Sequence, residues 1–308
     1  MKSRKITFLS LLMLGSVSLS ACYVDLGFIH FGTPDEEQGE VNEVDGKLIY
    51  DAEAQNSHIQ EYYATINSSQ SGDTLLSSLR NLNLAKRKKV VEYANMGTNP
   101  AGKYKFTDYD TRTVKFNNDG IPYGTKILSF YSGKSTSSFD REHVWPASRL
   151  PGGRDGNIVD SDILMPRPTD SVENQSRGNS VYVTDANSST NGWDPVAAFS
   201  TTLGNYEGIR GECARIIFYC LTVDDRCVID DDISYTSGCT HMGKISDLIE
   251  WTCDNPVNMR EKRRQVGAEY LQGNRNAFVD HPEYACKIWG GTNARTKAAC
   301  QRAGYAIN

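Results

Sequence analysis

The sequence predicts an α+β fold, a mainly helical domain arranged around a small β-region. Two observations support this prediction. Residues 104–131 alternate between polar and apolar types and contain the hairpin-type turn Asn117-Asn118-Asp119-Gly120, which is typical of short strands. After residue 205, apolar residues recur at helical spacing, most clearly over residues 209–221. A β-region followed by a run of helices indicates an α+β chain.

Helical periodicity marks segments on both sides of the β-region. Before it, leucines at helical spacing predict a helix near residues 73–82, followed by a basic run at 86–89. That run is either a solvated helix end or a phosphate contact. After it, helices are predicted around residues 245–249 and 259–270. The sequence Asp280-His281-Pro282-Glu283 has the pattern of a capping box that opens a further helix, so His281 is interpreted as structural.

The first residues are typical of an export signal. Residues 1–5 carry positive charge, residues 6–19 are largely apolar, and small residues precede Cys22. This pattern resembles a bacterial lipoprotein signal peptide, residues 1–21, whose removal leaves a lipid on Cys22. The apolar stretch is too short and too broken for a stable membrane span. The chain is therefore expected to be exported, either held by the lipid at the cell surface or outer membrane, or secreted with Cys22 as a plain thiol.

The segment after the leader is acidic and explains most of the net charge. Residues 33–45 contain almost no large apolar side chains, so residues 22–46 are predicted to be the lipid-bearing cysteine and a solvated tether. The formal net charge is −5 for all 308 residues. Without three basic residues of the leader and seven acidic residues after it, residues 46–308 carry a net charge of −1. A globally basic field is excluded, and any polyanion must bind to a local patch.

Eight cysteines in an exported chain predict disulfides. With Cys22 lipidated, seven remain and one is left over. Cys213 and Cys220 would lie roughly 10 Å apart on one helix, too far for a bond, and are expected to be buried thiols. The favoured pairs are therefore Cys227 with Cys239 and Cys286 with Cys300. A zinc site at Cys239, His241 and Cys253 is a weaker alternative, because the spacing matches no strong zinc pattern.

The stretch FDREHVWPASRL, residues 139–150, places Glu142 and His143 side by side in a predicted strand that Pro146 ends. A second stretch, residues 160–179, contains a short apolar run broken by prolines and then a short helix. Thr169 or Asp170 is its predicted cap, with Glu173 placed to close a capping box on Asp170, and Gly178 ends it. On that helix Asn174 and Arg177 share a face, because they are three residues apart.

These residue types fit hydrolysis of a phosphodiester bond. His143 can take a proton from water near neutral pH. Glu142 and Asn174 offer oxygen ligands to a hard divalent cation, and Arg177 offers a fixed positive fork to phosphate. Neighbours on a regular strand point to opposite faces, so Glu142 and His143 can converge only if the strand is bulged or ends there. Each residue alone is more often a surface or capping residue; their joint order favours a site.

The same stretches carry a resemblance to a known family. The chain resembles the bacterial endonuclease I family of periplasmic and secreted nucleases over roughly residues 55–290. The matching stretches are Asp140-Arg-Glu-His-Val-Trp-Pro146, Leu164-Met-Pro166, Asn174-Gln-Ser-Arg-Gly-Asn179, and residues 211–219 and 273–284. The resemblance implies that residues 47–308 form a catalytic domain with a ββα-metal (His-Me finger) motif.

The resemblance also implies a function. It implies a Mg²⁺-dependent endonuclease, with Mn²⁺ or Ca²⁺ as alternative ions, which cuts DNA and often RNA with little sequence preference and leaves 5′-phosphate ends. His143 would be the general base, Glu142 and Asn174 the metal ligands, and Arg177 a stabiliser of phosphate or product. Contacts would be mostly to phosphate, the only membrane contact would be a lipid on Cys22, and the protein is expected to be a monomer.

One departure from the family pattern leaves an alternative open. Where the family usually has a polar pair containing histidine, this chain has Asp162 and Ile163. That change slightly favours a second hypothesis, a surface-anchored nucleic-acid-binding protein on a nuclease scaffold that has lost turnover. A third hypothesis, a disulfide-rich helical lipoprotein of general function, leaves the order of Glu142, His143, Asn174 and Arg177 unexplained.

Overall fold

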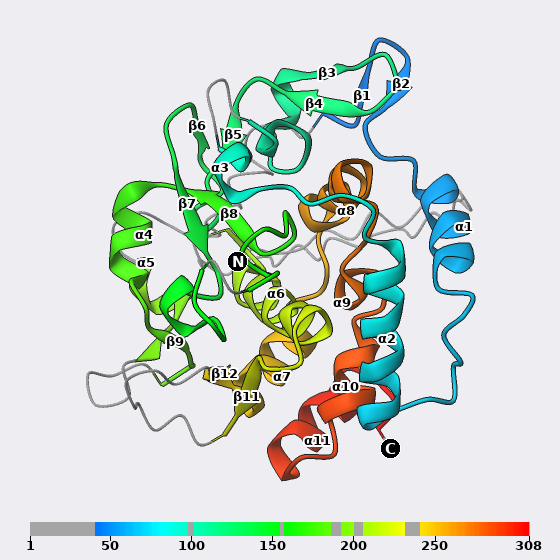
Figure 1. Ribbon diagram of the computed structural model, residues 1–308, viewed down its shortest axis with the longest axis vertical. Helices are drawn as coiled ribbons and strands as arrows, with labels where there is room; N and C mark the ends of the chain where they lie inside the picture. Colours follow the sequence, from blue (N-terminus) through cyan, green and yellow to red (C-terminus); the bar gives the residue numbers. More distant parts are fainter. Residues whose placement is uncertain are drawn as a thin grey trace, which may run out of the picture. The chain divides into compact units, whose positions relative to one another are not determined.

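Short strands in the middle of the chain and helices around them form the α+β arrangement that the sequence predicts (Figure 1). The computed structural model describes residues 41–97, 102–154, 157–185, 192–199, 206–231 and 241–307. All of these belong to one compact unit, residues 33–308. The predicted signal peptide and Cys22 lie outside the described residues.

The strands among the described residues are short and pair two by two. Antiparallel pairs are β1 (Glu43–Val44) with β2 (Lys47–Leu48), β3 (Val114–Phe116) with β4 (Pro122–Gly124), β5 (Ile127–Leu128) with β6 (Ser135–Thr136), and β7 (Asp140–His143) with β8 (Pro166–Thr169). Parallel pairs are β9 (Val181–Tyr182) with β10 (Gly192–Trp193), and β11 (Val228–Asp230) with β12 (His241–Lys244). The turn at residues 117–120 joins β3 to β4, which confirms the predicted hairpin.

The helices cover the rest of the described chain. The α-helices are α1 (Ala52–Tyr62), α2 (Gly72–Lys86), α3 (Tyr93–Met96), α4 (Ser171–Arg177), α5 (Pro195–Phe199), α6 (Ile209–Val223), α7 (Ile245–Asp254), α8 (Met259–Gln272), α9 (Ala277–Asp280), α10 (Glu283–Trp289) and α11 (Ala294–Arg302). Short 3₁₀ turns are η1 (Tyr104–Phe106), η2 (Thr111–Thr113) and η3 (Ala147–Arg149). None of the described helices is long and apolar enough to cross a membrane.

Helix α6 forms the centre of the helical part. It packs against α2, α7 and α9, and nearly every one of its side chains is buried (Figure 1). A helix that is apolar on all sides requires neighbours on all sides. Cys213 and Cys220 lie on it, both fully buried and unpaired, as the sequence predicts. Burial raises the pKa of both thiols well above the ordinary range, so they behave as apolar packing groups.

Close backbone contacts fix α8 against the β-region. A Cβ atom built on Gly267 would lie 1.9 Å from the carbonyl oxygen of Phe106, so only glycine allows α8 to approach η1 this closely. At its N-terminus α8 has a capping box between Asn258 and Glu261. The capping box predicted at residues 280–283 is wrong, because the Asp280 carboxylate accepts hydrogen bonds from Arg275 instead.

The end of the predicted tether is part of the fold. Residues 41–46 lead into β1 and the turn to β2, and Val41 and Val44 pack against a small apolar cluster of Ile49, Tyr109 and Val114. The remaining residues of the tether lie outside the described residues.

Candidate active site

Strand β7 and strand β8 pair antiparallel, and helix α4 begins directly after β8. The register runs without a shift from Asp140 opposite Thr169 to His143 opposite Pro166, and β7 ends at His143. The Asp170 carboxylate caps α4 by accepting from the Val172 amide at 2.8 Å. Gly178, with φ of 55°, ends the helix as predicted.

The predicted closing of this cap by Glu173 is wrong. Its carboxylate is buried and accepts instead from the Ser129 hydroxyl at 2.6 Å and the Thr169 hydroxyl at 2.7 Å. Ser129 in turn accepts a hydrogen bond from the Asp170 amide. These bonds join β5, β8 and the start of α4, so the strand pair and the helix form one rigid unit.

Because β7 is regular, its side chains alternate between two faces. Asp140 and Glu142 share the face toward α4, which packs against β7. Arg141 and His143 share the other face, where both contact the ring of Tyr93 on α3. The Arg141 guanidinium lies 4.0 Å and the His143 ring centroid 4.5 Å from the centroid of the Tyr93 ring. No bulge brings Glu142 and His143 to one face of β7, which ends at His143.

Glu142 is a buried carboxylate with few compensating partners. It is 1 % exposed, accepts from the Tyr131 hydroxyl at 2.7 Å, and lies 3.5 Å from Nη1 of Arg177. Burial raises the pKa of Glu142 to about 7, although the positive charge of Arg177 and the Tyr131 hydrogen bond oppose the shift. A cation bound beside Glu142 would therefore stabilise its ionised carboxylate.

Asn174 reaches the same face of β7 from α4. Its amide nitrogen Nδ2 lies 3.3 Å from the carboxylate of Asp140, which is exposed. Asn174 itself is half-buried. Asp140 and Glu142 thus offer two carboxylates on the face of β7 toward α4, and the Asn174 amide faces Asp140 from α4. Such donors suit a hard divalent cation, so the residues present fit the ion that the sequence analysis expects.

His143 is held by a carboxylate that the sequence analysis did not single out. Its Nε2 lies 2.6 Å from Oδ1 of Asp160, and both side chains are nearly buried. The bond fixes the ring and leaves Nδ1 as the nitrogen for other chemistry. Arg154, with a side chain 51 % exposed, lies 3.6 Å from the same carboxylate and stacks 4.8 Å from the Tyr93 ring.

Arg177 lies behind the end of β7 and not at the surface. It is 1 % exposed, and its Nη1 and Nη2 donate to the carbonyl oxygens of His143, Val144 and Gly178 at 2.7 to 3.1 Å. Three carbonyls thus hold the guanidinium against the end of β7, an arrangement that suits a positioning role. The expected contact of Arg177 with phosphate or product stays a prediction.

Comparison with known proteins identifies the family. The family model of endonuclease I matches residues 64–283, which include β7, β8, α4 and the helical core. The chain belongs to the endonuclease I family.

Two relatives of the chain are both named extracellular ribonuclease. The chain is 32 % identical to the extracellular ribonuclease of Bacillus amyloliquefaciens over 175 residues, 51 % of this chain and 56 % of the relative. It is 32 % identical to the extracellular ribonuclease of Bacillus subtilis (strain 168) over 201 residues, 60 % of this chain and 65 % of the relative. The chain thus spans between about half and two thirds of these relatives. No solved structure matches it.

The departure from the family pattern at Asp162 and Ile163 has a structural explanation. Asp162 is fully buried and accepts from the Tyr219 hydroxyl at 2.8 Å, the Gln272 amide at 2.7 Å and the Leu164 backbone amide at 3.0 Å. Ile163 is part of the core. Asp162 thus joins the segment before β8 to α6 and α8.

The predicted disulfide between Cys286 and Cys300 is present, with a Cα–Cα distance of 5.8 Å. Cys239 lies outside the described residues. Its pairing with Cys227 and the zinc alternative with His241 therefore stay predictions. Among the described residues, Cys227 is a buried free thiol.

Proposed function

We propose that this protein is an exported endonuclease that uses a divalent cation to hydrolyse phosphodiester bonds in nucleic acids, with β7, β8 and α4 as its ββα-metal motif. Membership of the endonuclease I family supports the reaction class. The observation that carries the proposal is the hydrogen bond between Nε2 of His143 and the Asp160 carboxylate at the end of β7, one residue after Glu142.

The cation is proposed to be Mg²⁺, with Mn²⁺ or Ca²⁺ as alternatives, held by Glu142 and Asn174 with Asp140 beside them. When bound, it would neutralise charge on the phosphate and on the departing 3′-oxygen. Glu142 needs no reorganisation for this task, because Tyr131 and Arg177 already fix its carboxylate. Arg177 contributes by holding the carbonyls of His143 and Val144, which sets the direction of the strand end.

His143 acts as the general base. With Nε2 bound to Asp160, Nδ1 takes the proton of the water that attacks phosphorus, and the Asp160 carboxylate stabilises the positive ring that results. Tyr93, stacked on the ring, excludes water from one side and prevents rotation. Loss of the 3′-oxygen leaves the phosphate on the 5′ end of the product.

Further phosphate contacts come from side chains other than Arg177. Arg141 and Arg154 stack on Tyr93 beside His143, and Arg154 is half-exposed. Next to α3 lies an open groove of about 860 Å³, lined by three lysines, Lys89, Lys103 and Lys105, by the acidic Glu92 and Asp119, and by the aromatic rings of Phe106 and Tyr270. Lys89 belongs to the basic run after α2, so this groove favours the phosphate-contact interpretation of that run.

The substrate is proposed to be both DNA and RNA, cut with little sequence preference by a monomer. The two relatives are named extracellular ribonucleases, which supports RNA as a substrate. Lysines and stacked arginines recognise the phosphate backbone, which is the same for every sequence. The word extracellular in the names of the two relatives also supports export, and the lipoprotein-type leader supports an anchor at Cys22.

Digestion of plasmid DNA and of ribosomal RNA with Mg²⁺, and then with EDTA, tests the proposal. The wild type is expected to cut both substrates only with the ion, and His143→Ala to lose at least 100-fold in rate. His58→Ala, which removes a histidine bound to Glu269 on α8, is the control. A folded His143→Ala protein that cuts at the wild-type rate would refute the mechanism, and a wild type without turnover would favour the binding-protein hypothesis.

The groove has a separate test. Binding of a single-stranded oligonucleotide is measured in EDTA at several salt concentrations. Lys103→Gln combined with Lys105→Gln is expected to reduce the slope of log K against log salt by about 1.4, since each phosphate contact to a single strand contributes about 0.7. Lys297→Gln, an exposed lysine of α11, should leave the slope unchanged. If all three proteins give the same slope, the oligonucleotide does not bind in this groove.

A further inference from the structure

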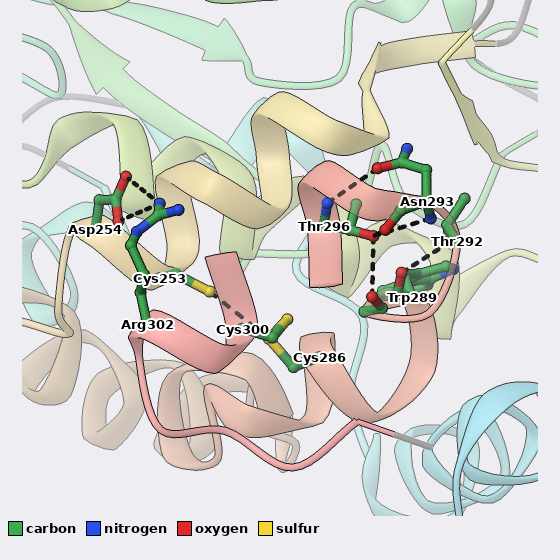
Figure 2. Close-up of a disulfide and its surroundings, with 10 residues drawn as sticks. Cys253, Asp254, Cys286, Trp289, Thr292, Asn293, Thr296, Cys300 and Arg302 are labelled. Carbon is green, nitrogen blue, oxygen red and sulfur yellow. Dashed lines mark hydrogen bonds and ion pairs between the residues drawn. A yellow bond between two sulfur atoms is a disulfide. The ribbon is translucent and has the colours of Figure 1, made fainter. Parts of the chain in front are cut away.

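Three cysteine sulfurs meet where α7, α10 and α11 pack together (Figure 2). Cys286 of α10 is bonded to Cys300 of α11. The sulfur of Cys253, near the end of α7, lies 3.6 Å from the sulfur of Cys286, and all three sulfurs lie within 4.8 Å of one another. Cys253 thus touches a disulfide in which it takes no part.

The three cysteines differ in exposure. Cys286 and Cys300 are 1 % and 0 % exposed, whereas Cys253 is only half-buried. An ion pair between Arg302 and Asp254 holds α11 against the end of α7 beside Cys253. The free thiol is therefore on the solvent side of the cluster, and packing keeps it beside the buried bond.

We propose that Cys253 is a second disulfide partner of Cys286, so that this cluster is a thiol–disulfide exchange site. In the exchange, the Cys253 thiolate attacks Sγ of Cys286 and forms a new S–S bond. The Cys286–Cys300 bond breaks, its electron pair leaves on Sγ of Cys300, and Cys300 takes up the proton that Cys253 lost. One disulfide and one thiol are present before and after, so neither an oxidant nor a reductant is consumed.

The movement required is small. The two sulfurs must approach by about 1.6 Å, from 3.6 Å to the ~2.0 Å of a disulfide. Because all three sulfurs are so close, Cys253 lies beside the existing bond and not in line with it. A rotation of the Cys253 side chain about its Cα–Cβ bond must therefore precede the attack, and its half-exposed position permits this.

Charges around the thiol make the exchange depend on pH. Burial, and then the negative charge of Asp254, raise the pKa of Cys253 to about 11; Glu250 adds to the shift and Arg302 opposes it. Since the thiolate is the attacking species, the exchange rate should rise about tenfold per pH unit below that value. At neutral pH the exchange is slow, which is consistent with one pairing being held.

The exchange would change which helices are cross-linked. The present bond joins α10 to α11, while the alternative joins α7 to α10 and frees α11 from its covalent link. Cys253 lies inside the range that matches the endonuclease I family, whereas Cys286 and Cys300 lie beyond residue 283. The inference does not depend on nuclease activity.

Cys300→Ala in the full mature chain tests the proposal. After oxidative folding, alkylation and non-reducing peptide mapping, a bond between Cys253 and Cys286 is expected. The matched control, Cys253→Ala with Cys300→Ala, has the same cavity at residue 300 but no partner for Cys286. The single variant should melt roughly 5–10 °C above this control. Alkylation of both Cys253 and Cys286 in the single variant, with equal melting temperatures, would overturn the proposal.

A second measurement covers the case in which Cys300→Ala does not fold. The wild type is incubated at pH 9.5 without reductant, quenched in acid and mapped in the same way. A fraction of chains with the Cys253–Cys286 bond and a free Cys300 is expected, and this fraction should appear more slowly at pH 7.5. If Cys286–Cys300 remains the sole pairing of these three residues at both pH values, the proposal is wrong.

Discussion

Replacement of Glu142 by glutamine is expected to make the metal-free protein more stable above neutral pH. The carboxylate is 1 % exposed, and burial raises its pKa from 4.5 to about 7. Because the folded pKa is the higher one, the folded state holds the proton more tightly than the unfolded chain. The stability associated with that proton is complete below pH 4.5 and is lost as pH rises through 7.

The size of the effect follows from the shift. The raised pKa corresponds to about 3 kcal/mol in full, most of which is lost between pH 5 and pH 8. Glutamine does not ionise, keeps an oxygen that can accept from Tyr131, and loses only the attraction to Arg177. The Glu142→Gln variant should therefore gain about 2 kcal/mol relative to the wild type between these pH values.

Urea unfolding in EDTA, followed by tryptophan fluorescence at pH 5 and pH 8, measures the difference. Trp145 lies two residues beyond His143 and is fully buried, which provides a local probe. Glu61→Gln, an exposed residue of α1, controls for the general loss of one negative charge. If the difference in unfolding free energy between wild type and Glu142→Gln is the same at both pH values, the burial argument for this carboxylate is refuted.

Three further predictions concern the base, the packing and the anchor. Asp160→Asn should lower kcat by roughly 10–100-fold with little change in KM, because asparagine keeps a partner for the ring but removes the charge that stabilises its protonated form; an unchanged kcat would exclude the pair from the mechanism. Gly267→Ala should cost about 3 kcal/mol in urea unfolding, because its Cβ would lie 1.9 Å from the Phe106 carbonyl oxygen; a cost below 0.5 kcal/mol would contradict the close approach. Cys22→Ala should abolish incorporation of labelled palmitate and release the protein from membranes; labelling that persists would contradict the anchor.

Periodicity and turn chemistry predicted much of the fold. The hairpin around residues 117–120 is present, and the helix predicted over residues 209–221 is observed as Ile209–Val223. Local signals of this kind depend on residues a few positions apart, so they can be read directly from the chain. The capping boxes predicted for Glu173 and Glu283 failed because these carboxylates have other partners. The Glu173 carboxylate accepts from Ser129, 44 residues away in sequence, and the Glu283 carboxylate lies 3.1 Å from Nδ1 of His281.

The site was predictable only in part, for a similar reason. The order of the stretches predicted Glu142, His143 and Asn174 near one strand end. Periodicity does not predict which polar side chains are buried, so it could not show that Arg177 lies inside the protein. Asp160 was within reach, since it opens the second stretch of the pattern, directly before Ser161 and Asp162. No sequence pattern pointed to Tyr93, because its contact with His143 spans 50 residues and depends on the docking of α3.

Crystals soaked with Mn²⁺ and measured at the manganese absorption edge would test the central claim most directly. The account predicts one strong anomalous peak between the carboxylate of Glu142 and the amide oxygen of Asn174, on the side of β7 that faces α4. The same peak should be absent from Asn174→Ala crystals. An ion bound elsewhere, with Glu142 still held by Tyr131 and Arg177 alone, would contradict the proposed metal centre and with it the assignment of the catalytic residues.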